Sequence, residues 1–151
     1  MASTVAVTGA SGFVGRAIVR ELLAREVRVR ALVRDIPTAR KALGSAPGLA
    51  FVGGDALDGR APAALLDGCN ACIHLIGILR ATPGNGFQRA HVDATRAMID
   101  ACPRAGVRRF LHMSALGVGD EGRTEYQKTK FQAETLVRRS GLDWTIFRPS
   151  L

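Results

Sequence analysis

The segment Thr4-Val5-Ala6-Val7-Thr8-Gly9-Ala10-Ser11-Gly12-Phe13-Val14-Gly15 decides the fold of this chain. Its first residues are apolar or β-branched and predict a short buried strand. Three glycines at a spacing of three follow at once. A helical pattern then begins, with one apolar face formed by Val14, Ala17, Ile18 and Leu22. The order of strand, glycine-rich turn and helix predicts the first unit of a parallel α/β sheet.

The same order is the context in which a glycine triplet binds a dinucleotide. Gly9 permits a turn that a Cβ would block, and Gly12 lets the backbone approach a pyrophosphate. Gly15 lets the helix pack closely on the strand, while the helix N-terminus offers free N–H groups to an anion. A glycine-rich turn without a ligand is the alternative, and the flanking strand and helix favour the cofactor loop over it.

Strand and helix patterns alternate along the rest of the chain. We expect strands at 27–33, 49–52, 71–76, 109–114 and 143–147, and helices at 38–43, 61–66, near 90–101 and from 124 to 139. Thr124 and Gln127 predict a capping box, while Pro103 and Gly106 predict the end of the preceding helix. This alternation predicts a doubly wound, Rossmann-like parallel sheet in a three-layer α/β/α domain that takes up residues 1–151.

Length and composition fit one globular domain. The chain has 151 residues, of which 47% are hydrophobic, enough for a sizeable core. No signal-peptide pattern and no apolar run of membrane-spanning length is present in the sequence, so we expect a cytoplasmic protein. The odd cysteine count agrees with a reducing compartment. Cys69 and Cys72 have CxxC spacing without a second pair, and we therefore expect no metal site.

The formal net charge of +8 raises the question of nucleic-acid or membrane-surface binding. The arginines are scattered along the chain, and no aromatic residues alternate with them to form a stacking platform. We therefore expect a solvated basic surface and no nucleic-acid partner.

Arg34 stands directly after the second predicted strand, at the turn that lies over the adenosine ribose in dinucleotide folds. An arginine at this turn accommodates a 2′-phosphate, whereas an acidic residue binds a 2′-hydroxyl. Arg34 therefore favours NADP(H), and Arg40 and Lys41 are further cations that could help to bind the 2′-phosphate. The neighbouring Asp35 would favour NAD(H), which stays open as the alternative cofactor.

Asp55 and Gly77 follow two further predicted strands. A carboxylate at the position of Asp55 can accept a hydrogen bond from an adenine amino group, or it can cap a helix or form a turn. Gly77 would let a cofactor approach its backbone. His74 alternates with apolar neighbours, so we expect it in the core.

Tyr126 and Lys130 are four residues apart and share one face of the last predicted helix. We expect the Lys130 cation to lower the pKa of the phenol, so that Tyr126 can exchange a proton with a substrate oxygen. An exposed surface pair is the alternative. Ser114 ends the fifth predicted strand and can either bind the reacting oxygen or cap the following loop.

Several motifs carry a family resemblance. Together, Thr8 to Gly15, Tyr126-Gln-Lys-Thr-Lys130 and Phe147-Arg-Pro-Ser150 resemble the short-chain dehydrogenase/reductase superfamily in its extended or atypical branches. More narrowly, Val33 to Asp35, His91 to Thr95 and Arg109 to Ala115 resemble epimerase/dehydratase-like proteins related to an NADPH-binding accessory subunit of respiratory complex I. The resemblance implies catalytic roles for Tyr126, Lys130 and Ser114. It implies cofactor contacts from Gly9, Ser11, Gly12, Phe13, Val14, Gly15, Arg34, Asp55, Ala56, Leu75, Gly77 and Lys130.

By this resemblance the protein is an oxidoreductase or an epimerase/dehydratase, in which hydride passes between a nicotinamide and a small-molecule substrate while Tyr126 moves the proton. Two departures, Ala115 in place of a second hydroxyl residue and His91 in place of asparagine, are typical of the complex I-related group. They keep open a non-catalytic NADPH-binding accessory or redox-sensing protein whose partners are respiratory-complex subunits. A homodimer is a further option.

The final motif also bears on chain length. In extended family members the segment after Arg148-Pro149 leads into the part that closes over the nicotinamide and binds substrate. We therefore expect the 151 residues to be the front portion of a longer protein that lacks its C-terminal substrate-binding part. Exposed apolar surface should mark where the absent part packs.

Overall fold

Six parallel strands form one sheet in the order β3-β2-β1-β4-β5-β6 in the computed structural model, which describes residues 2–150. Their bounds are β1 Thr4–Thr8, β2 Arg28–Val33, β3 Leu49–Gly53, β4 Ala71–His74, β5 Arg109–Met113 and β6 Asp143–Phe147. Every neighbouring pair is parallel, which confirms the expected sheet. The strand order reverses between β1 and β4, and a ligand of an open α/β sheet binds at such a switch point.

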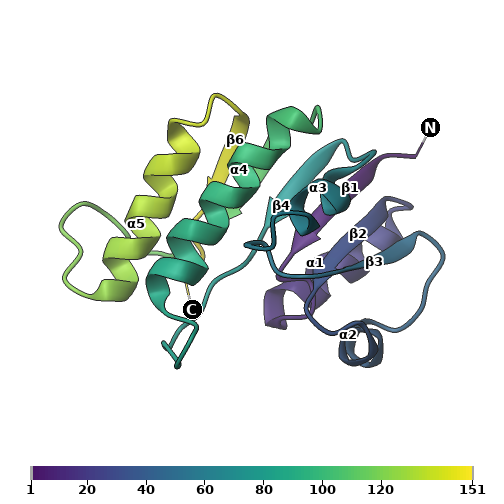
Figure 1. Cartoon of the computed structure of the whole chain (residues 1–151), viewed down its shortest axis with the longest axis horizontal. Coiled ribbons are helices and arrows are strands. Elements are labelled where there is room, and N and C mark those ends of the chain that lie inside the picture. The colour runs from purple at the N-terminus through teal and green to yellow at the C-terminus, as the bar shows by residue number, and fades with distance from the viewer. Residues whose placement is uncertain (1, 151) are drawn as a thin grey trace.

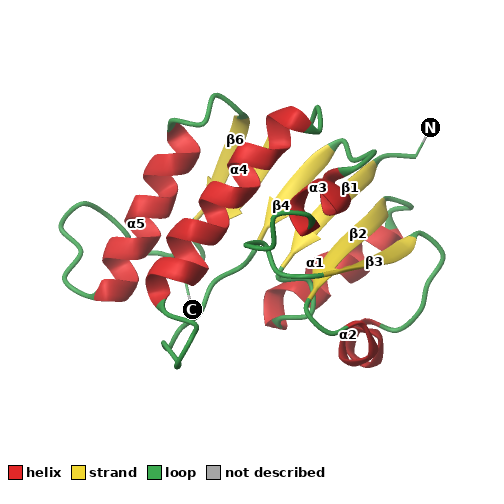
Figure 2. Ribbon diagram, viewed as in Figure 1, coloured by secondary structure: helices red, strands yellow, loops and turns green. Residues whose placement is uncertain are grey.

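Helices cover both faces of this sheet (Figure 1). Their bounds are α1 Phe13–Ala24, α2 Ile36–Leu43, α3 Ala61–Leu66, α4 Ala94–Arg104 and α5 Glu125–Arg138. Two separate cores result, because alternate strand residues point to opposite faces. Val5 and Val7 of β1 pack with Val19 of α1, whereas Ala6 belongs to the core under α3, α4 and α5. The layers in Figure 2 confirm the predicted three-layer α/β/α architecture.

Close backbone contacts explain the glycines of the first turn. Gly9 has φ +66°, and a Cβ on it would lie 2.9 Å from the carbonyl carbon of Leu75, just after β4. A Cβ on Gly15 would lie 2.1 Å from the Gly9 oxygen, a distance that no packed structure tolerates. Gly15 therefore lets α1 begin directly against the turn, as its position in the motif predicts.

The helix expected near residues 90–101 differs from a regular α-helix. It begins with a π-helical segment, η1 (Gln88–Asp93), that continues into α4. Pro103 lies inside the last turn of α4 and does not end it, since the single N–H lost there is close to the helix terminus. The π-helical turn was not predicted, because such segments have no distinct hydrophobic period.

Two predicted strands end earlier than expected, the one at 71–76 and the one at 109–114, which ends at Met113. The strand expected at 71–76 ends at His74, which pairs with Thr8, because β1 turns away at Gly9 and leaves Leu75 and Ile76 without a ladder partner on that side. The predicted capping box is confirmed: Thr124 Oγ1 accepts from the Gln127 N–H at 3.1 Å, and Gln127 Oε1 accepts from the Thr124 N–H at 3.3 Å.

The cysteines all lie in the interior of the described chain. Cys72 and Cys102 are fully buried, and the Cys69 thiol donates to the Leu65 carbonyl at 3.3 Å. Residues 2–150 contain no group of three or more metal-binding side chains of the His, Cys, Asp or Glu type. Within the same range, each helix falls short of the length and apolar character needed to cross a bilayer.

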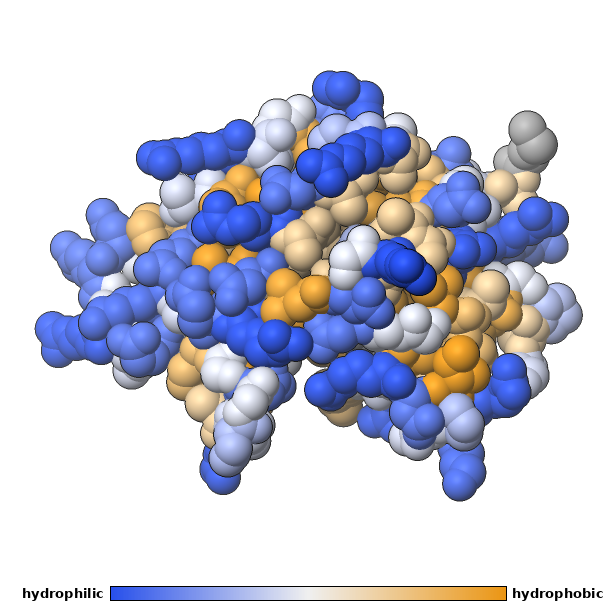
Figure 3. Space-filling model, in the orientation of Figure 1, coloured by the Kyte–Doolittle hydropathy of each residue, from blue (hydrophilic) through white to orange (hydrophobic). Residues whose placement is uncertain are grey.

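The surface is strongly polar on the side drawn in Figure 3. Hydrophilic side chains lie along most of the outline of this side, and apolar residues lie between them, mainly across its middle. Such a distribution agrees with the expected solvated surface on this face of the molecule.

Replacing Gly15 by alanine tests the packing of the first turn. We expect Gly15→Ala to lower the free energy of unfolding by about 1–3 kcal/mol, because the new methyl group would overlap the Gly9 carbonyl. Urea denaturation measures the change. Gly59→Ala is the matched control, since a Cβ on Gly59 meets no atom within 4 Å. Equal stability of the two variants would contradict this account of the turn.

Candidate dinucleotide-binding site

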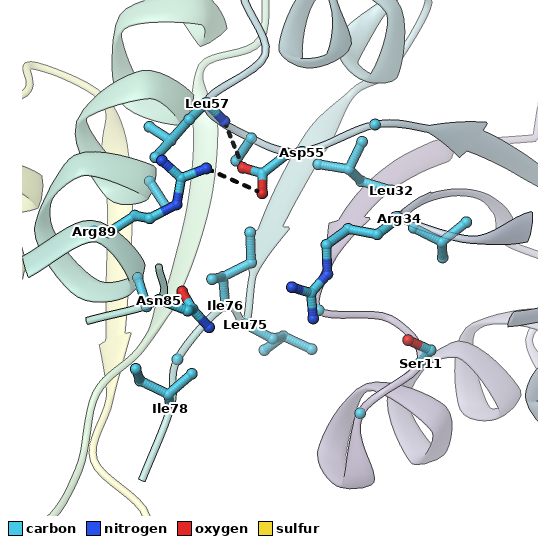
Figure 4. Close-up of a pocket in the computed structure, with 18 residues that line it drawn as sticks. Ser11, Leu32, Arg34, Asp55, Leu57, Leu75, Ile76, Ile78, Asn85 and Arg89 are labelled. Carbon is cyan, nitrogen blue, oxygen red and sulfur yellow. Dashed lines mark hydrogen bonds and ion pairs between the residues drawn. The ribbon is translucent and has the colours of Figure 1, made fainter. Parts of the chain in front are cut away.

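A cleft of about 270 Å³ opens at the carboxyl ends of β1 to β4 (Figure 4). Each of the loops that follow these strands supplies part of its lining. Among the lining residues are Gly9, Ser11, Gly12, Arg34, Asp55, Ala56, Leu75 and Gly77. The structure therefore brings together most of the residues that the sequence predicts to hold a cofactor.

The first turn of α1 follows directly after Gly12, which lines the cleft. Phe13, Val14 and Gly15 do not line the cleft, and the Phe13 ring is largely exposed. Gly12 is the N-cap of α1 and makes no side-chain capping bond. The first N–H groups of the helix consequently have no side-chain partner and can bind an anion.

Arg34 and Asp35 point to different surroundings. The Arg34 side chain extends into the cleft between Leu75 and Ser11 (Figure 4). Asp35 is the N-cap of α2 and accepts hydrogen bonds from the N–H of Thr38, at 3.2 Å, and from its hydroxyl. The carboxylate of Asp35 is therefore engaged with the helix, and Arg34 is the charged group that this loop presents to the cleft.

Asp55 combines a turn with a place in the cleft. Its Oδ1 accepts from the Leu57 N–H at 2.9 Å, and its Oδ2 lies 3.5 Å from Nη2 of Arg89. The next helix, α3, begins later, after Arg60, so Asp55 does not cap it. Of the two structural alternatives, the turn is the one that the structure contains.

Asn85 and Arg89 are lining residues that the sequence did not predict. Backbone hydrogen bonds of 3.0 and 3.1 Å to Thr82 hold Asn85 in a tight loop, and Arg89 belongs to η1. No local pattern around residues 85 to 89 indicates a cofactor contact. Only the return of this segment to the cleft brings Arg89 to Asp55.

Lys130 lies behind the far end of the cleft. The side chain is buried, and Nζ donates to the Met113 carbonyl at 2.8 Å. A Cβ on Gly77 would lie 3.6 Å from Nζ, so the amine stands directly beside this glycine. Burial lowers the pKa of Lys130 to about 8, which leaves the amine mainly protonated at neutral pH.

Tyr126 is half-buried, with its ring edge-on to His91 and Phe87 at centroid distances of 5.3 and 6.0 Å. The expectation that Lys130 lowers the pKa of Tyr126 is wrong. Burial raises the pKa of the phenol, and the Lys130 amine is directed to Met113. Tyr126 is therefore protonated at neutral pH, the state of a proton donor.

Ser114 is buried and does not line the cleft. Its hydroxyl has no hydrogen-bond partner among the described residues, but it lies near the carboxylate of Glu134. Burial favours a raised pKa for Glu134, yet hydrogen bonds from Arg148 at 2.9 and 2.6 Å, with Ser114 and Arg138 nearby, lower it. Tyr126 and Lys130 are also absent from the cleft lining, so the position of Ser114 does not separate its expected catalytic role from a structural one.

Buried threonines and histidines connect the cleft to the helices behind it. The Thr95 hydroxyl donates to the His91 carbonyl at 2.6 Å, so it accepts from Nε2 of His74 at 3.1 Å. Nδ1 of His74 then accepts from the Thr8 hydroxyl at 2.8 Å. His74 is a core histidine, as predicted, and burial holds its pKa well below the usual value.

His91 continues this network to α5. The Thr129 hydroxyl donates to the Glu125 carbonyl at 2.8 Å, so it accepts from Nδ1–H of His91 at 2.8 Å. Nε2 of His91 is then free to accept from the Ile78 N–H at 3.1 Å. Burial, followed by the Lys130 charge, lowers the pKa of His91 to about 4, and the neutral ring joins the loop after β4 to α5.

This geometry defines a class of protein. A parallel sheet whose strand order reverses beside a glycine turn and a helix N-terminus is that of a Rossmann-type dinucleotide-binding domain. Residues 9–151 match the family described as NAD(P)H-binding. The chain belongs to this family, and it is an NAD(P)-binding protein of the short-chain dehydrogenase/reductase, epimerase/dehydratase-like type.

Three similar proteins illustrate the range of the family. A ceramide reductase of Caulobacter vibrioides is 34% identical, over 96% of this chain and 45% of its own length. NADH dehydrogenase [ubiquinone] 1 alpha subcomplex subunit 9 of Mus musculus is 32% identical, over 95% of this chain and 39% of its own length. One similar solved structure is a short-chain dehydrogenase/reductase superfamily protein of Agrobacterium tumefaciens with bound NAD. It has a TM-score of 0.78 and 30% identity, and the match covers 96% of this chain and 48% of that one. The chain thus spans about half the length of the relatives that it matches, or less.

His112 generates a prediction about stability. Its ring is buried, both nitrogens are without a partner among the described residues, and burial lowers its pKa to about 3. Between pH 6.5 and 3 the unfolded chain binds the additional proton, so the native state loses stability as the pH falls. We expect His112→Phe to raise the free energy of unfolding at pH 7 by about 1–2 kcal/mol and to make the acid dependence shallower.

Urea denaturation between pH 4 and pH 7 measures this effect. The matched control is His74→Phe, which breaks the hydrogen bonds to Thr8 and Thr95 and should destabilise the protein at pH 7. A similar loss of stability in His112→Phe would show that His112 has a polar partner, and would contradict the prediction.

Proposed function

We propose that this protein is an NADP(H)-dependent reductase in which Tyr126 donates a proton to a substrate carbonyl. The observation that carries the proposal is one continuous surface, from Arg34 through the glycine turn to Gly77, with the Lys130 amine beside Gly77. In this proposal Arg34 would bind the adenosine end of the cofactor, and the nicotinamide would lie toward Gly77, where Lys130 is close.

The residues of the cleft fit a bound dinucleotide. The close approach that Gly9 and Gly12 allow suits a pyrophosphate against the backbone, and the α1 N-terminus suits its charge. Asp55 suits an adenine amino group, and Lys130 suits the hydroxyls of the nicotinamide ribose. When bound, the nicotinamide supplies or accepts the hydride.

Arg34 supports NADP(H) as the preferred cofactor. Its guanidinium extends into the cleft, where it can form a bidentate pair with a 2′-phosphate. The competing carboxylate of Asp35 is engaged as the cap of α2.

Tyr126 suits the role of proton donor in this proposal. A phenol with a raised pKa holds its proton at neutral pH and can deliver it to the oxygen of a carbonyl that accepts a hydride. Lys130, protonated and fixed by Met113, adds positive charge near the same oxygen. These two residues carry the proton chemistry in this proposal.

Substrate selection, we propose, depends on structure outside residues 2–150. Leu79 and Leu116 are exposed in loops after β4 and β5, and Trp144 and Phe147 are exposed on the edge strand β6. Among the described residues, the core under α1 and α2 contains no side chain of β5 or β6. Further chain or a partner protein would cover these positions and complete a substrate pocket. The three buried thiols suit a reducing compartment such as the cytoplasm.

A non-catalytic NADPH-binding accessory protein is the second candidate function. The mouse relative is a subunit of NADH dehydrogenase and matches 95% of this chain. Subunits of a respiratory complex would then be the partners.

Cofactor choice is tested at Arg34. We expect wild type to bind NADPH more tightly than NADH, and Arg34→Gln to weaken NADPH binding by about 10- to 100-fold through loss of a charge-assisted pair. NADH binding should change little. Calorimetric titration gives both dissociation constants. The matched control is Arg40→Gln, because the Arg40 guanidinium lies over the Phe51 ring, 5.7 Å from its centroid. Equal NADPH affinity in wild type and Arg34→Gln would contradict the assignment.

Proton transfer is tested at Tyr126 in the full natural chain. We expect Tyr126→Phe to reduce kcat by about 100-fold or more while NADPH affinity stays unchanged, because only the acidic proton is removed. Lys130→Met should reduce both kcat and the affinity for NADPH. The assay follows NADPH oxidation on aldehydes, ketones and nucleotide sugars. Full activity of Tyr126→Phe would contradict its role, and NADPH binding without turnover on any substrate would favour the accessory function.

A further inference from the structure

We propose that Arg89 is a second determinant of NADP(H) preference, which acts by neutralising the Asp55 carboxylate in the cleft. This inference rests on the proposed NADP(H)-dependent function. It assigns a role to a residue that carries no motif and that only the fold brings to the cofactor cleft.

The geometry places Arg89 on the wall opposite Arg34. Both arginines line the cleft, and Figure 4 shows them on either side of its opening. Nη2 of Arg89 lies 3.5 Å from Oδ2 of Asp55, with 47% and 40% of the two side chains exposed. Arg89 is thus close enough to Asp55 to offset its charge, and it still faces the space that a ligand would enter.

The ion pair is not needed to hold Asp55 in position. Oδ1 of Asp55 already accepts from the Leu57 N–H at 2.9 Å, which fixes the carboxylate in its turn. Exposed ion pairs also contribute little to folding stability. The main effect of Arg89 is therefore on the charge of the cleft.

This charge discriminates between the two cofactors. Among the described residues that line the cleft, Arg34, Arg89 and Asp55 are the charged ones. With all three present the lining has an excess of one positive charge, and without Arg89 the excess disappears. An unpaired carboxylate at Asp55 would repel a 2′-phosphate, whereas a 2′-hydroxyl carries no charge. Arg89 should therefore favour NADPH much more than NADH.

The proposed pair is compatible with adenine recognition. Each carboxylate oxygen has two lone pairs, so Asp55 can accept from Leu57, remain beside Arg89 and still accept from an adenine amino group. The bond from Asp55 to adenine then adds equally to the affinity for NADPH and NADH. The neutralisation of Asp55 by Arg89 adds only to the affinity for NADPH.

A double-mutant cycle tests the proposal. The dissociation constants of NADPH and NADH are measured by calorimetry at low salt for wild type, Arg89→Gln, Asp55→Asn and the double variant. We expect Arg89→Gln to weaken NADPH binding about tenfold with little change for NADH. Asp55→Asn in the Arg89→Gln background should restore most of the NADPH-to-NADH ratio. The difference in NADPH affinity between wild type and Arg89→Gln should shrink at 1 M salt, where charges are screened beyond about 3 Å.

Arg96→Gln is the matched control, because Arg96 lies seven residues further along the same helical run, is exposed and does not line the cleft. It should leave both affinities unchanged. The inference would be overturned if Arg89→Gln lost equal affinity for NADPH and NADH, or if the double variant did not recover the NADPH-to-NADH affinity ratio. A wild-type preference for NADPH would still support the proposed function in that case. A wild-type protein that bound neither cofactor would overturn both.

Discussion

The contact between the backbone of Gly9 and that of Gly15 is the constraint on which the rest of the site depends. Because neither residue has a Cβ, the chain leaves β1, turns against the backbone of Leu75 and begins α1 within a few residues. This fixes β1, β4 and α1 around the point where the strand order reverses. The loops after β1 to β4 consequently meet, and the cleft forms between them.

A network of buried hydrogen bonds extends this order to α5, the helix that contains Tyr126 and Lys130. It begins at Thr8, the last residue of β1, passes through His74 and Thr95 to the His91 backbone, and continues from the His91 ring to Thr129. This polar framework joins β1 and β4 to η1, α4 and α5 on one face of the sheet. A neutral His91 is required in this framework, and burial supplies that condition by lowering its pKa.

The sequence predicted those features that depend on local spacing. Glycines at intervals of three indicated the turn, and the four-residue interval between Tyr126 and Lys130 put both on one helix. The strand patterns gave a parallel sheet, whose carboxyl edge then collected Arg34, Asp55 and Gly77. In each case the prediction needed only the period of one element or the general rule for ligands of open sheets.

Features that depend on contacts between distant segments were missed. β5 ends at Met113, one residue before the predicted end at Ser114, and the Ser114 side chain lies near Glu134 of α5, a neighbour that local spacing does not reveal. The pKa of Tyr126 depends on its burial beside His91 and Phe87, which the interval to Lys130 does not reveal. Arg89 meets Asp55 only because a π-helical segment returns to the cleft.

The central claim is that the glycine turn and the cleft beside it hold the dinucleotide. The most direct test follows the amide chemical shifts of the isotope-labelled protein during titration with NADPH. The account predicts saturable shifts that are largest at Gly9, Gly12 and Gly77 and small at Ala64 of α3 and Asp100 of α4, which do not line the cleft. Saturable binding that left the amides of these three glycines unchanged, or no binding at all, would contradict it.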